Sequence, residues 1–298
     1  MPHKSGRFTA LVLAIAVVLI WGVSFAATRI AVQEIPPLTL AFLRFALASV
    51  ILWPLVRHRW GTIRLARRDR RAGFLLGLTG VTLAFVFENF GLKYTTASHA
   101  ALIVSITPLA TTMTEAVMAR RFPHLRTLGG LLAALAGVAL IVGSSEAGAG
   151  SVVGDLLMLM TVWSWVAYSF LTQRLTRSYP TLVVTQTALV VGALTLSPLA
   201  ATEVLVRGVE LPSATTVVAL LYLGVFCSAI AYLWWNRAIQ VLGVTTTNSL
   251  IYGIPLVGVV AGVALLGEPL TWMVALGGLL IIGGVMAAGW QLHPNRDP

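Results

Sequence analysis

The stretch TNSLIYGIPL (Thr247–Leu256) places an asparagine, a tyrosine and a proline inside a mostly apolar run. Counting back 147 residues gives AALIVSITPL (Ala100–Leu109), which has its proline in the same place. A proline supplies no backbone N–H, and its ring clashes with the preceding turn, so it interrupts a helix. Because the two interruptions lie 147 residues apart, about half the length of the chain, they predict a chain built from two related halves.

The composition of the 298-residue chain is that of a membrane protein. Hydrophobic residues make up 58% of it and charged residues only 10%, whereas soluble domains carry about 25% charged residues. About 20 apolar residues suffice to cross a bilayer, and no unpaired backbone group is tolerated there, so each apolar run is predicted to be a helix. We therefore predict an all-α polytopic membrane protein. The ten predicted spans are residues 8–32, 38–56, 72–94, 97–118, 126–143, 151–174, 181–200, 213–239, 244–265 and 270–290.

Basic residues gather on one side of these spans. Of the 20 lysine and arginine residues, 16 lie on the side that holds both termini, many of them in the loop Arg57–Arg71. The positive-inside rule places that side in the cytoplasm. The net charge of +10 is therefore explained by a lipid bilayer as the partner, and nucleic acid is not expected.

The two halves align over most of their length. A gap-free shift of 147 residues superimposes spans three to five on spans eight to ten, and a shift of 144 residues superimposes spans one and two on spans six and seven. Shared apolar composition is the alternative explanation, but the matches include proline, glycine, tryptophan and asparagine. Each half has five spans, an odd number, so the second half enters the membrane from the opposite face. We predict a 5+5 inverted-topology repeat, residues 8–143 and 151–290, around a central cavity that opens alternately to each side. Matched pairs include Asn89 with Asn236, Pro108 with Pro255, Gly137 with Gly284, and Trp21 with Trp165.

Four motifs resemble a known family. They are WGVSFAATR (Trp21–Arg29), LAFLRF (Leu40–Phe45), GLKYTTASHAALIVSITPL (Gly91–Leu109) and LLGEPLTWMVALGGLLIIGGV (Leu265–Val285). Together they resemble the EamA-type branch of the drug/metabolite transporter superfamily, in its ten-helix amino-acid exporter form. The resemblance covers nearly the whole chain and implies export of amino acids or related metabolites across the bacterial inner membrane. One departure is that Glu268 fits the acidic loop position of the family, while its repeat equivalent is Arg121.

The two prolines are candidate hinges near the middle of spans four and nine. Pro108 and Pro255 deprive the carbonyls of Val104 and Ile251 of their regular helical partners, so these carbonyls are expected to face water, another helix or a ligand. Paired breaks of this kind point to a transport site. A kink that only improves packing is the alternative.

Polar and aromatic residues inside the spans are candidates for contact with the cargo. Asn248 and Tyr252 share a helix face because they are four residues apart. Trp21 and Trp163 fall near the centres of spans one and six, so they are expected to face the bundle interior with Trp165 rather than lipid. Ordinary packing is the alternative for each residue. The candidates for a substrate-binding site are Trp21, Ser24, Phe85, Glu88, Ser105, Trp163, Tyr168, Tyr232, Asn248 and Tyr252.

Two charges are expected inside the membrane, at similar depth. Arg44 lies in span two and Glu88 in span three. Intramembrane charges are costly and are usually functional. They either pair with each other or meet the carboxylate and ammonium of a substrate, and both interpretations stay open here.

Three functions compete at this point. Export of small amphiphilic metabolites, above all amino acids, is favoured, and efflux of toxic lipophilic compounds is the alternative within transport. An intramembrane enzyme would need a nucleophile–base pair or a metal set within the spans. The five histidines lie at or beyond span ends, so we predict no enzyme, no metal and no cofactor. A homo-oligomer stays open as an alternative to a monomer.

Overall fold

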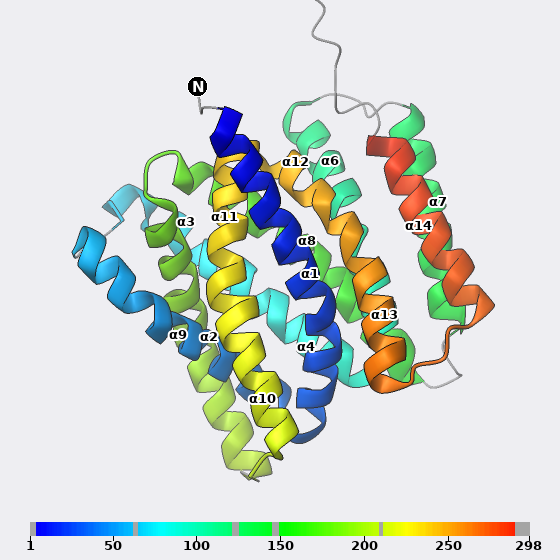
Figure 1. Ribbon diagram of the computed structural model, residues 1–298, viewed down its shortest axis with the longest axis horizontal. Helices are drawn as coiled ribbons and strands as arrows, with labels where there is room; N and C mark the ends of the chain where they lie inside the picture. Colours follow the sequence, from blue (N-terminus) through cyan, green and yellow to red (C-terminus); the bar gives the residue numbers. More distant parts are fainter. Residues whose placement is uncertain (1–3, 62–64, 121–124, 145–148, 209–210, 290–298) are drawn as a thin grey trace, which may run out of the picture.

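The computed structural model is a bundle of helices (Figure 1). It describes residues 4–61, 65–120, 125–144, 149–208 and 211–289, and all regular secondary structure in these ranges is helical. Two short segments, η1 (Arg67–Asp69) and η4 (Leu250–Gly253), are 3₁₀-helices, and η2 (Leu78–Leu83) and η3 (Leu223–Ile230) are π-helices. The α-helices are α1 (Lys4–Glu34), α2 (Pro37–Trp60), α3 (Arg70–Gly77), α4 (Ala84–Tyr94), α5 (Ala97–Val104), α6 (Thr107–Met118), α7 (Leu125–Ser144), α8 (Ala149–Thr176), α9 (Thr181–Arg207), α10 (Ala214–Tyr222), α11 (Ala231–Leu242), α12 (Val244–Ser249), α13 (Ile254–Leu266) and α14 (Trp272–Gly289).

The helices are long and apolar enough for a multi-pass membrane protein. Within the described ranges, eight helical stretches can cross a bilayer by length and composition. They correspond to eight of the predicted spans, including the division at Thr95 and Thr96 between α4 and α5. The other two predicted spans, 126–143 and 270–290, fall on α7 and α14, and the count of ten stays a prediction.

The helices pack in pairs that join the two halves of the chain. Helix α1 packs against α11 and α13 in the middle of the bundle, and α4 packs against α8. Helices α7 and α14 lie side by side at one edge, and α2 packs against α9 near the opposite edge (Figure 1). Helix α1 begins and α14 ends at the same end of the bundle (Figure 1).

The two π-helical segments occupy overlapping positions when the chain is shifted by 147 residues. A π-helix disturbs the regular i→i−4 hydrogen bonding, and in each segment a side chain from another helix bonds to a backbone carbonyl. The Tyr232 hydroxyl donates to the Gly80 carbonyl at 2.6 Å, and the Trp21 indole N–H donates to the Cys227 carbonyl at 3.0 Å. Gly80 and Cys227 are themselves 147 residues apart. The same local irregularity therefore recurs in both halves, with a different donor in each.

The two proline-containing runs are interrupted as predicted. Helix α5 ends at Val104 and α6 begins at Thr107, while η4 separates α12 from α13. Each proline lies in the first turn of its new helix, where a backbone N–H is not needed. The expectation that the displaced carbonyls face water, another helix or a ligand is wrong. The Thr107 hydroxyl donates to the Val104 carbonyl at 2.6 Å, and the Ile254 N–H donates to the Ile251 carbonyl, so both bonds are local.

A glutamate from a distant part of the chain caps helix α5. The Glu268 carboxylate accepts hydrogen bonds from the backbone N–H groups of Ala97 at 2.8 Å and Ser98 at 3.0 Å, and from the Ser98 hydroxyl at 2.6 Å. The first N–H groups of a helix have no partner within it, and the helix dipole favours a negative charge there. Two further helix starts are capped alike, by Glu203 at Thr39 of α2 and by Glu34 at Ser213 before α10.

We expect Glu268→Ala to lower the free energy of unfolding by about 1–2 kcal/mol, which is the usual cost of removing an N-cap side chain. Glu268→Gln keeps one acceptor oxygen and should lose less. Thermal unfolding in detergent, followed by size-exclusion chromatography, measures both variants. An unchanged midpoint for Glu268→Ala would show that this cap does not stabilise the start of α5.

Candidate functional site

A cavity opens where the two halves of the bundle meet. Its walls come from α1, α2, α4 and the α5–α6 break on one side, and from α8, η4 and α13 on the other. Both interrupted runs contribute, because Val104 and Ile251 line it. The lining residues are Trp21, Ser24, Phe25, Arg44, Ala84, Phe85, Glu88, Val104, Thr107, Thr161, Val162, Trp165, Ile251 and Ile254.

Arg44 supplies the positive charge of this cavity. Its side chain is 1% exposed, its Nε donates to the Ser228 hydroxyl at 3.0 Å, and its guanidinium lies 4.4 Å from the ring centre of Phe85. Nη1 has no hydrogen bond, and the nearest Glu88 oxygen is 3.9 Å from it. At that distance Coulomb attraction persists, but no hydrogen bond forms. The predicted pair therefore exists as a loose ion pair in the cavity wall.

A second unbonded donor lines the same cavity from the other half of the chain. Trp165 of α8 is 8% exposed, and its indole N–H has no hydrogen-bond partner. An unsatisfied buried donor costs about 1–3 kcal/mol, so an acceptor that reached it would be bound favourably. The repeat-equivalent Trp21 differs, because its N–H is already bonded to the Cys227 carbonyl. The ring centroids of the two tryptophans are 5.2 Å apart, edge to face.

The hydroxyls around the cavity already donate to backbone carbonyls. Ser24 donates to Trp21 at 2.7 Å, and Thr161 donates to Ala84 at 3.2 Å. Together with Thr107, these groups keep oxygen lone pairs that can accept a hydrogen bond. A ligand here meets an aromatic wall, one cation, one carboxylate and several hydroxyl acceptors.

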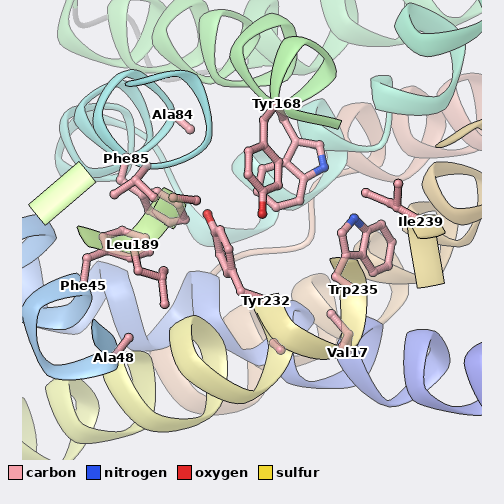
Figure 2. Packing of buried hydrophobic residues seen from close by; sticks show 14 of the residues in the cluster. Val17, Phe45, Ala48, Ala84, Phe85, Tyr168, Leu189, Tyr232, Trp235 and Ile239 are labelled. Atoms are coloured by element: carbon pink, nitrogen blue, oxygen red, sulfur yellow. The ribbon is translucent and has the colours of Figure 1, made fainter. Parts of the chain in front are cut away.

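Tyr168 and Tyr232 pack beside the cavity and do not line it. Both are fully buried, and Tyr168 donates to the Asn236 side chain at 2.8 Å, which in turn donates to Thr185 at 2.8 Å. Figure 2 shows Tyr232 between Tyr168 and the pair Phe45 and Phe85. Partners on distant helices hold both hydroxyls inside the packed core, and a role of these tyrosines in substrate binding stays a prediction.

The candidates on the interrupted helices are also outside the cavity lining. Asn248 is fully buried and donates to Thr111 of α6 at 2.9 Å, so it links α12 to α6. The Ser105 hydroxyl donates to the Leu102 carbonyl, within its own turn. Tyr252 is partly buried and packs on a small apolar cluster that contains Leu102. Pro108 and Pro255 are buried at the starts of α6 and α13, and their role as hinges stays a prediction.

Trp163 faces outward. Its side chain is 53% exposed, so the prediction that it faces the bundle interior is wrong. Successive residues of a helix are about 100° apart, so Trp163 and Trp165 point to nearly opposite sides of α8. Only one of the two can line the cavity, and it is Trp165.

The cavity therefore contains Trp21, Ser24, Phe85, Glu88 and Arg44 from the predicted set. Sequence reasoning did not select Trp165, Thr107 and Thr161 as site residues. For Trp165 a signal existed, because it aligns with Trp21 under the 144-residue shift. Among the described residues, no three His, Cys, Asp or Glu side chains cluster as a metal site would require.

Comparison with known proteins gives a consistent picture. The sequence profile of the EamA-like transporter family matches residues 8–143 and 152–290. A protein of Archaeoglobus fulgidus called "Uncharacterized transporter" is 31% identical over 291 residues, covering 96% of this chain and 98% of that protein.

Two further relatives carry names that mention amino acids. The "Probable amino-acid metabolite efflux pump" of Escherichia coli is 27% identical and covers 96% of this chain and 94% of its own. The "Probable terminal-alkyne amino-acid exporter" of Streptantibioticus cattleyicolor is 28% identical, with coverage of 90% and 89%. A solved crystal structure matches with a TM-score of 0.68 at 22% identity, over 94% of this chain and 97% of that one, which is a likeness of fold.

Proposed function

The chain belongs to the EamA-like transporter family, and from this premise we propose that it exports amino acids or related small amphiphilic metabolites by alternating access. The membrane it crosses in this proposal is the bacterial inner membrane, with both termini in the cytoplasm. The names of the two relatives that handle amino acids support the cargo class.

The observation that carries the proposal is the pair of unbonded donors in the cavity wall. Nη1 of Arg44 and Nε1 of Trp165 are buried nitrogens without a hydrogen bond, and both residues line the cavity. Two donors that lack acceptors are complementary to a carboxylate, which offers two acceptor oxygens and a negative charge. Glu88 lies close enough to Arg44 to receive an ammonium group of the same ligand. The aromatic wall suits an apolar side chain.

The inverted repeat belongs to the proposal as its mechanical part. It is supported by π-helical segments and proline breaks that recur at an offset of 147 residues, and by helix pairs that join the halves. Ten spans with an odd number in each half would let the halves exchange conformations around the fixed cavity. Helix α1 begins and α14 ends at the same end of the bundle (Figure 1). This arrangement supports the part of the proposal that places both termini on one side of the membrane.

Counterflow in proteoliposomes tests the function. Vesicles loaded with a mixed amino-acid pool are expected to take up a subset of labelled amino acids saturably. The matched competitors are the decarboxylated amine and the methyl ester of each transported amino acid, which keep the ammonium group and side chain. They should compete at least about tenfold more weakly, because a charge-assisted hydrogen bond contributes about 1.5–3 kcal/mol. Equal competition by the amines, or transport of lipophilic cations alone, would favour the efflux alternative and contradict a carboxylate site.

A further inference from the structure

A second buried polar cluster lies outside the cavity, where α5 packs against α8. Asp155 of α8 is fully buried, and His99 of α5 is 6% exposed. Nδ1 of His99 lies 3.5 Å from Oδ2 of Asp155, and the Thr95 hydroxyl donates to Oδ1 at 2.5 Å. None of these three residues lines the cavity. The cluster joins the first half of the chain to the second.

A carboxylate and an imidazole are a costly choice for simple packing at this place. Burying a carboxylate requires compensating charge or hydrogen bonds, and neutral polar residues would join two helices at lower cost. Histidine is the side chain whose ordinary pKa lies closest to neutral pH, so it changes charge in the physiological range. With a proton on the imidazole, the pair is an ion pair that holds α5 to α8. Without that proton, the Coulomb attraction between two opposite charges is lost, and no hydrogen bond between Nδ1 and Asp155 replaces it in this structure.

Among the described residues, Asp155 is the charged group that lies within ion-pair distance of His99. Glu268, from the connection between α13 and α14, is bonded to the N-terminus of α5. Arg29 of α1 donates to the carbonyls of Leu92 and Lys93 at the end of α4. Among the described side chains, the other charged groups on the elements packed against α5 are Arg7 and Glu34 near the two ends of α1, Lys93 and Glu88 of α4, Arg126 in the first turn of α7 and Arg174 in the last turn of α8, and α13 and the described part of α14 have none.

Helix α5 connects this cluster to the cavity. It contains only eight residues, from Ala97 to Val104, so it is about 12 Å long. His99 lies in its first turn, and its last residue, Val104, lines the cavity. Helix α5 is therefore a short, continuous link between this pair and the cavity wall beside the proline break.

We propose that the His99–Asp155 pair is the proton-binding site that drives export. This inference rests on the proposed transport function. A proton from the outer side binds the His99 imidazole facing Asp155, and the same proton is released to the cytoplasm in the opposite conformation. One proton enters for each cargo molecule that leaves, and no bond other than that to the proton forms or breaks.

The test separates exchange from gradient-driven transport in the same proteoliposomes. Counterflow at equal pH needs no net proton movement, whereas uphill transport under an imposed pH gradient does. For one proton exchanged per cargo, one pH unit should give about a tenfold accumulation ratio, since one unit corresponds to about 1.4 kcal/mol. We expect His99→Gln and Asp155→Asn to keep counterflow within about twofold and to accumulate cargo no further than equilibrium. A pH dye inside the vesicles should show cargo-dependent proton movement for the wild type and none for the variants.

His58→Gln is the matched control, because His58 lies exposed in the last turn of α2 and should behave as wild type. A wild-type accumulation ratio in either pair variant would overturn the proposal. If the variants elute as folded protein but lose both counterflow and accumulation, the proposal is also overturned, and the pair has a structural role. Wild-type counterflow without any response to the gradient would reject the proton site and leave the export function intact. Absence of wild-type counterflow would reject both.

Discussion

Replacing Arg44 with glutamine is expected to weaken amino-acid binding about 10- to 100-fold, because a charge-assisted hydrogen bond to a carboxylate contributes about 1.5–3 kcal/mol. Arg44 is buried in the cavity wall, and its Nη1 has no hydrogen bond. Arg44→Lys keeps the charge but loses the planar fork and the contact with Phe85, so it should also weaken binding. The half-saturating concentration in counterflow measures both effects.

A double variant distinguishes a substrate site from a structural ion pair. Arg44→Gln alone leaves Glu88 without its buried counter-charge, which can destabilise the fold by itself. Arg44→Gln combined with Glu88→Gln removes both charges and keeps the cavity neutral. We expect this double variant to fold and to fail in transport. Normal transport by Arg44→Lys and by Glu88→Gln would rule out contact between this pair and the cargo.

Gly80→Ala is expected to cause the largest loss of stability among single methyl additions near the core. A methyl group built on Gly80 overlaps the ring of Tyr168. That ring is fully buried, and its hydroxyl is bonded to Asn236, so it cannot turn aside without breaking that bond. Overpacking of this kind costs about 1–3 kcal/mol. The thermal midpoint of the purified protein in detergent measures the loss.

Gly129→Ala in α7 is the control for this substitution. A methyl group at Gly129 has no described neighbour within 4 Å, and alanine is the better helix former by about 0.5–1 kcal/mol. Its midpoint should equal or exceed that of the wild type. Equal midpoints for Gly80→Ala and the wild type would mean that Tyr168 can yield, and that the π-helical segment is not packed as tightly as the structure indicates.

Sequence reasoning reached the helical architecture because the decisive signals are local. Apolar runs of membrane-spanning length predict helices, and a proline removes a hydrogen bond from its own segment wherever the chain folds. Arg44 and Glu88 were identified because charges within apolar runs need partners. The π-helical segments were not predicted, because their sequences are ordinary apolar runs that an α-helix would also accommodate.

Residues whose role depends on a distant partner were assigned less well. Tyr168 and Tyr232 look like cavity residues until their acceptors, Asn236 and the Gly80 carbonyl, are known. Asn248 lies beside a helix break, but it bonds to Thr111 on a different helix. Trp163 and Trp165 were both expected to face inward, although a spacing of two residues on a helix turns them to different sides. Only tertiary packing decides which of them faces inward.

The two repeat-equivalent tryptophans are bonded unequally. Trp21 has an acceptor in the Cys227 carbonyl, whereas the N–H of Trp165 has none. The difference amounts to one hydrogen bond, or about 1 kcal/mol, which is small beside the binding energy of even a weak ligand. In the proposed export cycle, a carboxylate that reaches Trp165 supplies the missing acceptor, so that both repeat-equivalent tryptophans are then hydrogen-bonded.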